Sequence, residues 1–323
     1  MKTTQHKSNK NVCLFGEYAA TTKLHIMFKE TAAITVLCVD AFQSLIIVTG
    51  NTFTIFVFWI HRIKLKRTSI FLINLAVADL LVGFTDFVVL GTHAFPRHIG
   101  ISRENKTPIL IKGNIATSFQ AVFSIVSVLF LVLISLERAF ALLWPLCHRV
   151  TSTEAYIYSV VIVWVAGITV GALSLSALYD LVDFRYYLIV VCVIIAFSLA
   201  TICVSYLAIR TRLNRRVPPM DTAHNRQSVE HNSKLSKTLF IVIAASLAFW
   251  VPCIVLYCVH YLFQEMFSDA LVYIFNMLHL TNSLVNPIIY GLRMPTFRET
   301  LKRLKNKLKI RKQSKRYTVN NGV

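Results

Sequence analysis

The stretch NIATSFQAVFSIVSVLFLVLISLE, residues 114–137, decides the class of fold, because it carries no charged residue before its final glutamate. Its length is enough to cross the roughly 30 Å of hydrocarbon in a lipid bilayer as one α-helix. A helix also satisfies the backbone polar groups that hydrocarbon cannot. The stretch therefore predicts a transmembrane helix.

Six other apolar blocks of similar length lie along the chain, and 55% of all residues are hydrophobic while only 15% are charged. We predict an all-α membrane protein in which residues 34–292 form a seven-transmembrane helix bundle. Residues 1–33 would form an N-terminal tail, and residues 293–323 a C-terminal region. The seven blocks are residues 34–60, 70–92, 114–137, 156–178, 186–209, 238–262 and 270–292.

The formal net charge of +19 suggests nucleic acid as a partner, but the distribution of the basic residues argues against it. They gather in short segments between the apolar blocks and in the C-terminal tail. If the N-terminus is outside, 24 of the 34 Lys and Arg residues fall on the inner side. Basic residues mark cytoplasmic segments. We therefore predict a multi-pass plasma membrane protein with an extracellular N-terminus, a cytoplasmic C-terminus and no nucleic acid partner.

Two features near the N-terminal half agree with this topology. The sequon Asn105-Lys106-Thr107 lies in a loop that the topology places outside, which makes Asn105 a candidate glycosylation site. The first 30 residues are polar and show no signal-peptide pattern, so we expect the first spanning helix to act as its own insertion signal.

The segment after the seventh block combines apolar and basic residues at helical spacing. A proline, Pro295, stands near the expected first turn, which favours a helix over a disordered basic tail. We predict a short amphipathic helix on the inner membrane surface, with basic residues facing anionic lipids. Its apolar positions are Phe297, Leu301, Leu304 and Leu308.

Polar residues inside the spanning helices form the first candidate site, near the middle of the membrane. Helical spacing places Asn51, Asp79, Ser127, Asn282 and Asn286 in one layer if their helices face inward. A carboxylate among neutral oxygens is a plausible sodium site, with Asp79 as the charged ligand. Spacing alone supports equally a hydrogen-bonded network that holds the helices together, or an Asp79 that stays protonated.

A second polar layer lies in the outer half of the bundle and predicts a ligand pocket open to the outside. Interhelical hydrogen bonding is the alternative for each residue, and for a lone histidine it is the better one. Two acids in one layer favour a site for a cationic ligand group, because buried unpaired carboxylates are costly. The layer comprises Asp40, Asp86, Gln120, Ser124 and His279, which could be joined by Trp250, Tyr257 and His260.

Taken together, these motifs resemble the rhodopsin-like (class A) G-protein-coupled receptors over essentially the whole chain, in order and at family spacing. Any one of them would be weak evidence; Glu137-Arg138 alone is an ordinary interfacial ion pair. The matching motifs are Gly50-Asn51, Asn74-Leu75-Ala76-Val77-Ala78-Asp79, Glu137-Arg138-Ala139, Trp164, Tyr206, Trp250-Val251-Pro252 and Asn282-Ser283-Leu284-Val285-Asn286-Pro287-Ile288-Ile289-Tyr290.

The resemblance implies roles for these residues. Asp79 and its layer would bind sodium, and Trp250 would form the floor of the ligand pocket. Arg138 would leave Glu137 on activation and meet a heterotrimeric G protein, which the basic third inner loop, residues 210–237, would help to dock. The implied coupling and activation switch consists of Glu137, Arg138, Tyr206, Pro252, Pro287 and Tyr290.

The chain also departs from the family pattern. Gly113 stands where the family has a cysteine bridged to the second outer loop, and the loop Tyr179–Arg185 is short and has no cysteine. Ser198 replaces the usual fifth-helix proline, and Asn232 stands where an acid often faces Arg138. In these features the chain resembles the melanocortin receptors, which belong to the same group as the adenosine, cannabinoid and sphingolipid receptors.

Other functions fit less well. An opsin needs a lysine in the seventh helix, and none lies between Lys237 and Lys302. A biogenic-amine receptor usually has an aspartate at the position of Gln120. We predict no enzymatic activity, because no nucleophile–base pair is apparent. A polytopic transporter or channel remains the alternative, although inverted repeats and broken helices are not seen. The ligand would be a peptide or a small cationic or lipid mediator.

Overall fold

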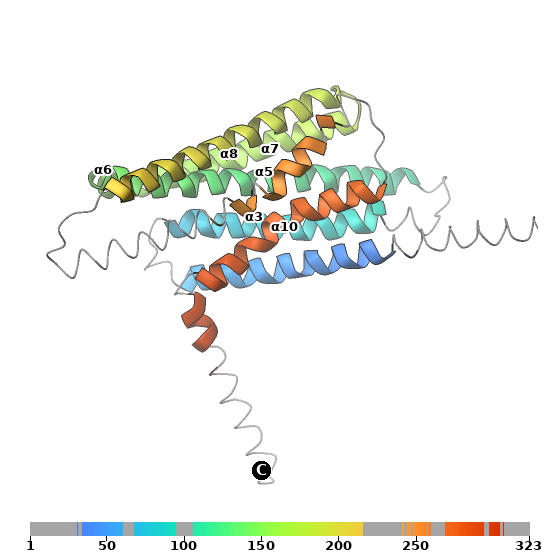
Figure 1. The fold of residues 1–323 in the computed structure, drawn as a ribbon. Coiled ribbons are helices and arrows are strands. Elements are labelled where there is room, and N and C mark those ends of the chain that lie inside the picture. Colours follow the sequence, from blue (N-terminus) through green and yellow to red (C-terminus); the bar gives the residue numbers. More distant parts are fainter. Residues whose placement is uncertain are drawn as a thin grey trace, which may run out of the picture.

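The computed structural model describes residues 31, 34–60, 68–94, 106–215, 241, 244–246, 248–256, 258–259, 269–293, 297–303 and 306. All regular elements in these ranges are helices, and the long ones lie side by side as a bundle (Figure 1). The elements are a first helix Ile34–Ile60, α3 (Thr68–Val89), η1 (Leu90–Ala94), α5 (Lys106–Leu143), α6 (Pro145–Val150), α7 (Thr153–Leu178), α8 (Phe184–Arg215), a sixth helix Ala244–Leu256 and α10 (Asp269–Arg293).

The length and composition of these helices agree with the predicted membrane bundle. Among the described residues, five helices are long and apolar enough to cross a membrane, and the sixth helix is a shorter apolar one. The 25 residues of α10 supply the seventh. It is not among those five, and polar residues such as Asn276, Asn282 and Asn286 interrupt it. The all-α, seven-helix class is thereby confirmed.

Several helices extend beyond the apolar blocks that predicted them. The third block covered residues 114–137, whereas α5 runs from Lys106 to Leu143, and α8 runs from Phe184 to Arg215 rather than over 186–209. Hydropathy marks only the part of a helix that lies in hydrocarbon. The backbone hydrogen bonds continue into the polar interface, where charged residues are tolerated, so the helices are longer than the blocks.

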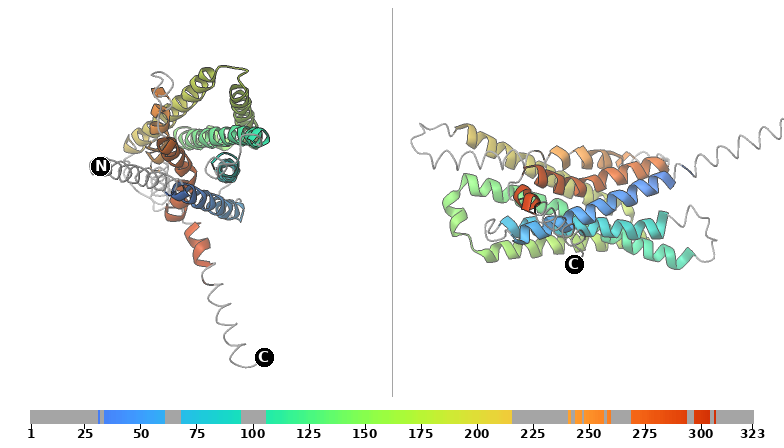
Figure 2. Two further views of the ribbon diagram at one scale, coloured as in Figure 1. Left: turned by 90° about the vertical axis from the view of Figure 1, so that its right-hand side faces the viewer. Right: turned by 90° about the horizontal axis from the view of Figure 1, so that it is seen from below.

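The helix α5 lies at the centre of the bundle and packs against α3, α7 and α8. Figure 2 (left) looks along the bundle, so that several of its helices are seen nearly end on. Glycines bring α7 close to α5. A Cβ atom at Gly167 would collide with the side chain of Val126, and one at Gly171 with Val122. Small residues at such positions allow the close helix contacts on which membrane bundles depend.

A short helix follows α10 and confirms the helical part of the C-terminal prediction over residues 297–303. It leaves α10 at a steep angle (Figure 1). Phe297 is buried against Phe53 and Phe58, with ring centroids 5.7 and 5.5 Å apart, whereas Leu301 is exposed. Phe297 therefore anchors this helix to the bundle. Leu304 and Leu308 lie outside the described residues.

Candidate functional site

The middle of the bundle contains a carboxylate that binds to two other helices. Asp79 of α3 is completely buried. Its Oδ1 accepts hydrogen bonds from Ser127 of α5 at 2.6 Å and from Ser283 of α10 at 2.7 Å. Its Oδ2 accepts one from Asn286 of α10 at 2.8 Å. The carboxylate thus joins α3, α5 and α10 in a single polar cluster.

Two other residues predicted for this layer are nearby but bind elsewhere. Asn282 accepts a hydrogen bond from Ser246 of the sixth helix at 2.8 Å. Asn51 donates to the carbonyl oxygens of Ile47 and Ser283, at 3.0 and 3.2 Å. Its own Oδ1 is buried without a hydrogen-bond partner among the described residues. Asn51 is therefore linked to the cluster through the backbone of α10.

The sequence prediction missed Ser283, although it contacts Asp79 directly. Ser283 lies three residues before Asn286, a spacing that places both on one face of a helix. Helical phase could therefore have identified it. The prediction instead named the neighbouring Asn282, which follows His279 at helical spacing.

The outer layer contains a second buried carboxylate with its own set of partners. Asp86 of α3 is completely buried. It accepts hydrogen bonds from Ser44 of the first helix at 2.5 Å and from Gln120 of α5 at 3.1 Å. Asn276 of α10 also hydrogen bonds to it. The sequence prediction included Gln120 but missed Ser44 and Asn276.

Asp40 of the first helix lies near Asp86, and the two carboxylates interact electrostatically. Asp40 is only 2% exposed, and its Oδ1 has no hydrogen-bond partner among the described residues. Asp40 and Ser44 are one helical turn apart on the same face. The first helix therefore presents both side chains toward Asp86.

A cavity of about 180 Å³ lies between α5, α7, α8, the sixth helix and α10. Most of its lining is apolar. Four residues of the predicted ligand pocket line it, whereas Asp40 and Asp86 are not among its lining residues. Tyr257 and His260 fall outside the described residues. Its polar or aromatic lining residues include Gln120, Ser124, Trp250, Asn276 and His279.

Two residues that line this cavity have polar atoms without a hydrogen-bond partner in the described part of the chain. The rings of Trp250 and His279 meet edge to face, with centroids 4.5 Å apart. Within the described part of the chain, the Trp250 Nε1 and the Ser124 Oγ are buried and have no hydrogen-bond partner. A buried donor without a partner is costly. Both residues line the cavity.

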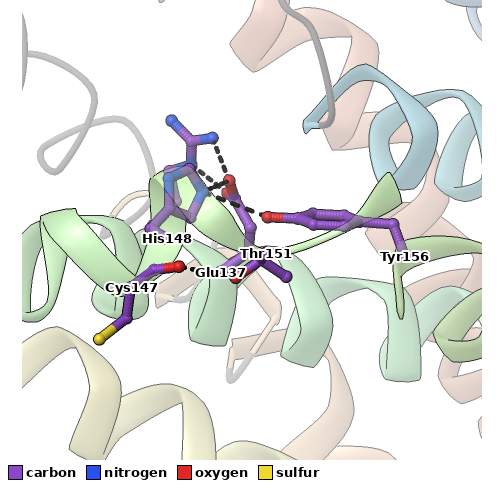
Figure 3. Close-up of polar contacts among 6 residues, drawn as sticks. Glu137, Cys147, His148, Thr151 and Tyr156 are labelled. Atoms are coloured by element: carbon purple, nitrogen blue, oxygen red, sulfur yellow. Dashed lines mark hydrogen bonds and ion pairs between the residues drawn. The ribbon is translucent and has the colours of Figure 1, made fainter. Parts of the chain in front are cut away.

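Near the C-terminal end of α5, Glu137 binds two basic side chains (Figure 3). The Nε of Arg138 lies 2.5 Å from Oε2 of Glu137, and a second guanidinium nitrogen lies 2.8 Å from Oε1. The Nε2 of His148 in α6 lies 3.1 Å from Oε1. The hydroxyl of Tyr156 in α7 lies 3.2 Å from the same His148 nitrogen. His148 and Tyr156 are additions that sequence reasoning missed.

The remaining residues of the predicted switch lie on α8, the sixth helix and α10. Tyr290 is buried and packs edge-on against Phe58, with ring centroids 5.4 Å apart. Tyr206 of α8 packs at the edge of the same apolar cluster. Pro287 lies inside α10, and a Cβ at Gly50 would come within 3.3 Å of its ring. Gly50 thus allows the first helix to approach α10 at its proline. Pro252 lies inside the sixth helix.

The connection between α7 and α8 is very short. Residues 179–183 connect α7 to α8, and Asp180 adopts a left-handed conformation with φ of 57°. Aspartate tolerates this conformation better than most residues, which permits a tight turn. None of the six cysteines within the described residues forms a disulfide. Gly113 lies within α5, and the sequon residue Asn105 lies outside the described residues, as does Asn232.

Comparison with known proteins identifies the class to which this bundle belongs. The family model described as 7 transmembrane receptor (rhodopsin family) matches residues 50–290, about three quarters of the chain. The chain belongs to this family and is a rhodopsin-like G-protein-coupled receptor with multiple membrane-spanning helices. The family is one of receptors, which favours this reading over a transporter, a channel or an enzyme.

Individual relatives are distant and their names refer to different ligands. The chain is 28% identical to cannabinoid receptor 2 of Homo sapiens over 260 residues, which cover 74% of this chain and 69% of that receptor. It is 25% identical to trace amine-associated receptor 13c of Danio rerio, over 90% of this chain and 88% of the relative. It is 27% identical to the substance-K receptor of Homo sapiens, over 76% of this chain and 66% of that receptor.

Proposed function

We propose that this receptor lies in the plasma membrane with residues 1–33 outside and residues 293–323 in the cytoplasm. An extracellular ligand binds in the cavity lined by Gln120, Ser124 and Trp250, and the inner surface activates a heterotrimeric G protein. A ligand that binds the active arrangement more tightly shifts a pre-existing equilibrium toward it.

The observation that carries this proposal is the continuity of α5. This one helix lines the outer cavity with Gln120 and Ser124 and binds the central carboxylate of Asp79 through Ser127. At its inner end it holds the Glu137–Arg138 ion pair. A displacement of α5, or of the helices packed against it, therefore affects all three layers. In the active state Arg138 leaves Glu137 and contacts the G protein.

The cavity supports a ligand with an apolar body and a few polar groups. Its lining is mostly apolar, which favours burial of hydrocarbon or aromatic surface. The unsatisfied Trp250 Nε1 donates to an acceptor on the ligand, and Ser124 exchanges a hydrogen bond with it. A cationic group of a peptide or small amine would point toward Gln120 and Asn276, behind which Asp86 supplies negative charge.

The central cluster is proposed to bind sodium through Asp79 when the receptor is inactive. The carboxylate and the hydroxyl oxygens of Ser127 and Ser283 are hard oxygen ligands, the type that such cations prefer. Asn282 and Asn51 lie in the same layer, and the Oδ1 of Asn51 is a buried acceptor without a described partner. A small rearrangement of these oxygens would complete the coordination.

The proposal is tested by nucleotide exchange on a panel of purified G proteins, with wild-type receptor in lipid nanodiscs and a library of candidate ligands. We expect exchange with at least one G protein, and its loss in Arg138→Ala. Arg185→Ala is the matched control, because Arg185 is an exposed arginine at the opposite end of the bundle. Equal exchange by the wild type and Arg138→Ala across the panel would refute the proposed coupling.

A further inference from the structure

The two outer acids carry a charge that the described structure does not neutralise. The groups that hydrogen bond to Asp86 are neutral: Ser44 of the first helix, Gln120 of α5 and Asn276 of α10. No ion pair to Asp40 or Asp86 occurs within the described residues. Both carboxylates are nevertheless buried next to each other.

Two adjacent carboxylates cannot both remain ionised in such an environment without a counter-charge. Burial penalises each charge, and their mutual repulsion adds to the penalty. The other titratable residue predicted for this layer is His279 of α10, whose ring packs against Trp250. Apart from Asp40 itself, the described side chains that the first helix and α5 contribute to this layer are neutral, including Gln43 and Gln120. Within the described residues no basic side chain pairs with these acids, so we take the counter-charge to come from solution.

We propose that Asp40 and Asp86 form a second cation site, which holds one small monovalent cation, a proton or Na⁺, when no ligand is bound. The free Oδ1 of Asp40 and the carboxylate of Asp86 supply the negative charge. The Oγ of Ser44 and the side-chain oxygens of Gln120 and Asn276 are the neutral ligands within reach. This inference goes beyond the proposed function and does not depend on it.

The second site is separate from the one at Asp79. Asp86 is seven residues further along α3, about 10 Å at 1.5 Å per residue. The two carboxylates share no hydrogen-bond partner, since Ser127, Ser283 and Asn286 serve Asp79 alone. Each site can therefore be emptied without removing a ligand of the other.

The second site also borders the ligand cavity. Gln120 and Asn276 hydrogen bond to Asp86 and line the cavity at the same time. A cation between the acids therefore sets the orientation of two amides that face the ligand. A ligand with a cationic group would displace the small cation and neutralise the charge of the two carboxylates in its place.

The experiment measures thermal unfolding of the purified receptor in nanodiscs without any ligand. Sodium is exchanged for N-methyl-D-glucamine at constant ionic strength, and the series is repeated across about pH 6 to 8. The Asp79→Asn variant removes the central site from the measurement. In that background we compare Asp40→Asn, Asp86→Asn and both together, with Glu299→Gln as an exposed-acid control.

We expect the Asp79→Asn receptor to keep a cation-dependent shift in Tm that disappears when Asp40 and Asp86 are both neutralised. A bound cation stabilises the folded state more as its concentration rises above the dissociation constant. If the cation is Na⁺, Tm rises with sodium at fixed pH. If the cation is a proton, the folded receptor binds it at neutral pH whereas the unfolded carboxyl groups do not. The Tm then falls as pH rises and does not depend on sodium.

A second measurement covers the case in which the double variant does not fold. Infrared difference spectra of the folded Asp40→Asn receptor should lack either a protonated-carboxyl band or a sodium-induced carboxylate band that the wild type shows. The proposal is overturned if neutralising the acids changes neither the sodium dependence nor the pH dependence of Tm. It is also overturned if Asp40→Asn leaves both infrared bands unchanged. Loss of G-protein coupling would leave these readouts intact, so the two proposals fail separately.

Discussion

Asn286 of α10 donates a hydrogen bond to Asp79 of α3, with 2.8 Å between Nδ2 and Oδ2. The next residue, Pro287, lies inside α10 and cannot donate a backbone hydrogen bond. The link therefore holds α10 to the core at the point where its own hydrogen-bond ladder is weakened. A change in the charge of Asp79 would therefore alter the hydrogen bond that holds α10 at this point.

The first prediction concerns that charge. Asp79→Asn should abolish the effect of sodium on basal nucleotide exchange and on the affinity of any activating ligand, because it removes the charged ligand of the central site. Asp183→Asn, at an exposed acid, should leave the sodium effect intact. The measurement is exchange with sodium replaced by N-methyl-D-glucamine. A sodium effect of wild-type size in Asp79→Asn would contradict the assignment.

The second prediction concerns the inner ion pair. Glu137→Gln should raise basal exchange, because Arg138 loses its carboxylate partner and reaches the G-protein-binding arrangement more often. A hydrogen bond to a charged group contributes roughly 1.5–3 kcal/mol, so an increase of about tenfold is expected. His148→Ala should have a smaller effect in the same direction, since it removes one contact and leaves the pair. Basal exchange at or below the wild-type rate in Glu137→Gln would speak against the switch.

The third prediction concerns the contact between α5 and α7. Gly171→Ala should lower the Tm of the receptor, because its Cβ would collide with Val122 and lie 3.3 Å from the carbonyl oxygen of Ser118. Overpacking of this kind costs about 1–3 kcal/mol. Gly291→Ala is the matched control, since a Cβ there meets nothing within 4 Å. Equal Tm values for the two variants would show that α7 can move away from α5 without cost.

The fourth prediction concerns the cavity. Ala121→Phe should fill part of the space of about 180 Å³ and lower the potency of a ligand that binds there at least tenfold, while basal exchange persists. Ala200→Phe adds the same volume at an exposed position of α8 and should change neither property. Potency is read from dose–response curves of exchange. Unchanged potency in Ala121→Phe would place the ligand elsewhere.

Much of the fold could be predicted because hydrocarbon imposes a simple rule on the sequence. Each block such as residues 114–137 must be helical, since the backbone has no other way to satisfy its polar groups in a bilayer. The ends of the helices were less accurate, because residues such as Lys106 can continue a helix outside the hydrocarbon. Helical phase likewise predicted that Ser127 and Asn286 would lie near Asp79, since interior polar side chains must face one another.

The partners of the polar residues could be predicted only in part. Ser44, Ser246 and Ser283 each donate a hydrogen bond that links two helices. Serine is common in membrane helices, so its presence alone does not indicate which serines bind a polar partner. His148 and Tyr156 belong to the inner ion-pair cluster although they lie on α6 and α7, beyond the apolar block that contains Glu137. The contacts of His148 and Tyr156 with this cluster depend on how the chain folds back toward α5 after the turn at Pro145.

The amino-acid sequence by itself determined that this chain is a seven-helix membrane protein with polar layers inside it. Apolar blocks of this length are stable as helices in lipid, and the polar residues within them must face the interior of the bundle. Only the tertiary structure decided which side chains meet in those layers. It separated Asp40 and Asp86 from the lining of the cavity and gave Asp79 and Asp86 different partners. Rotation and separation of helices depend on close packing, as at Gly171 against Val122, and periodicity within one helix does not contain that information.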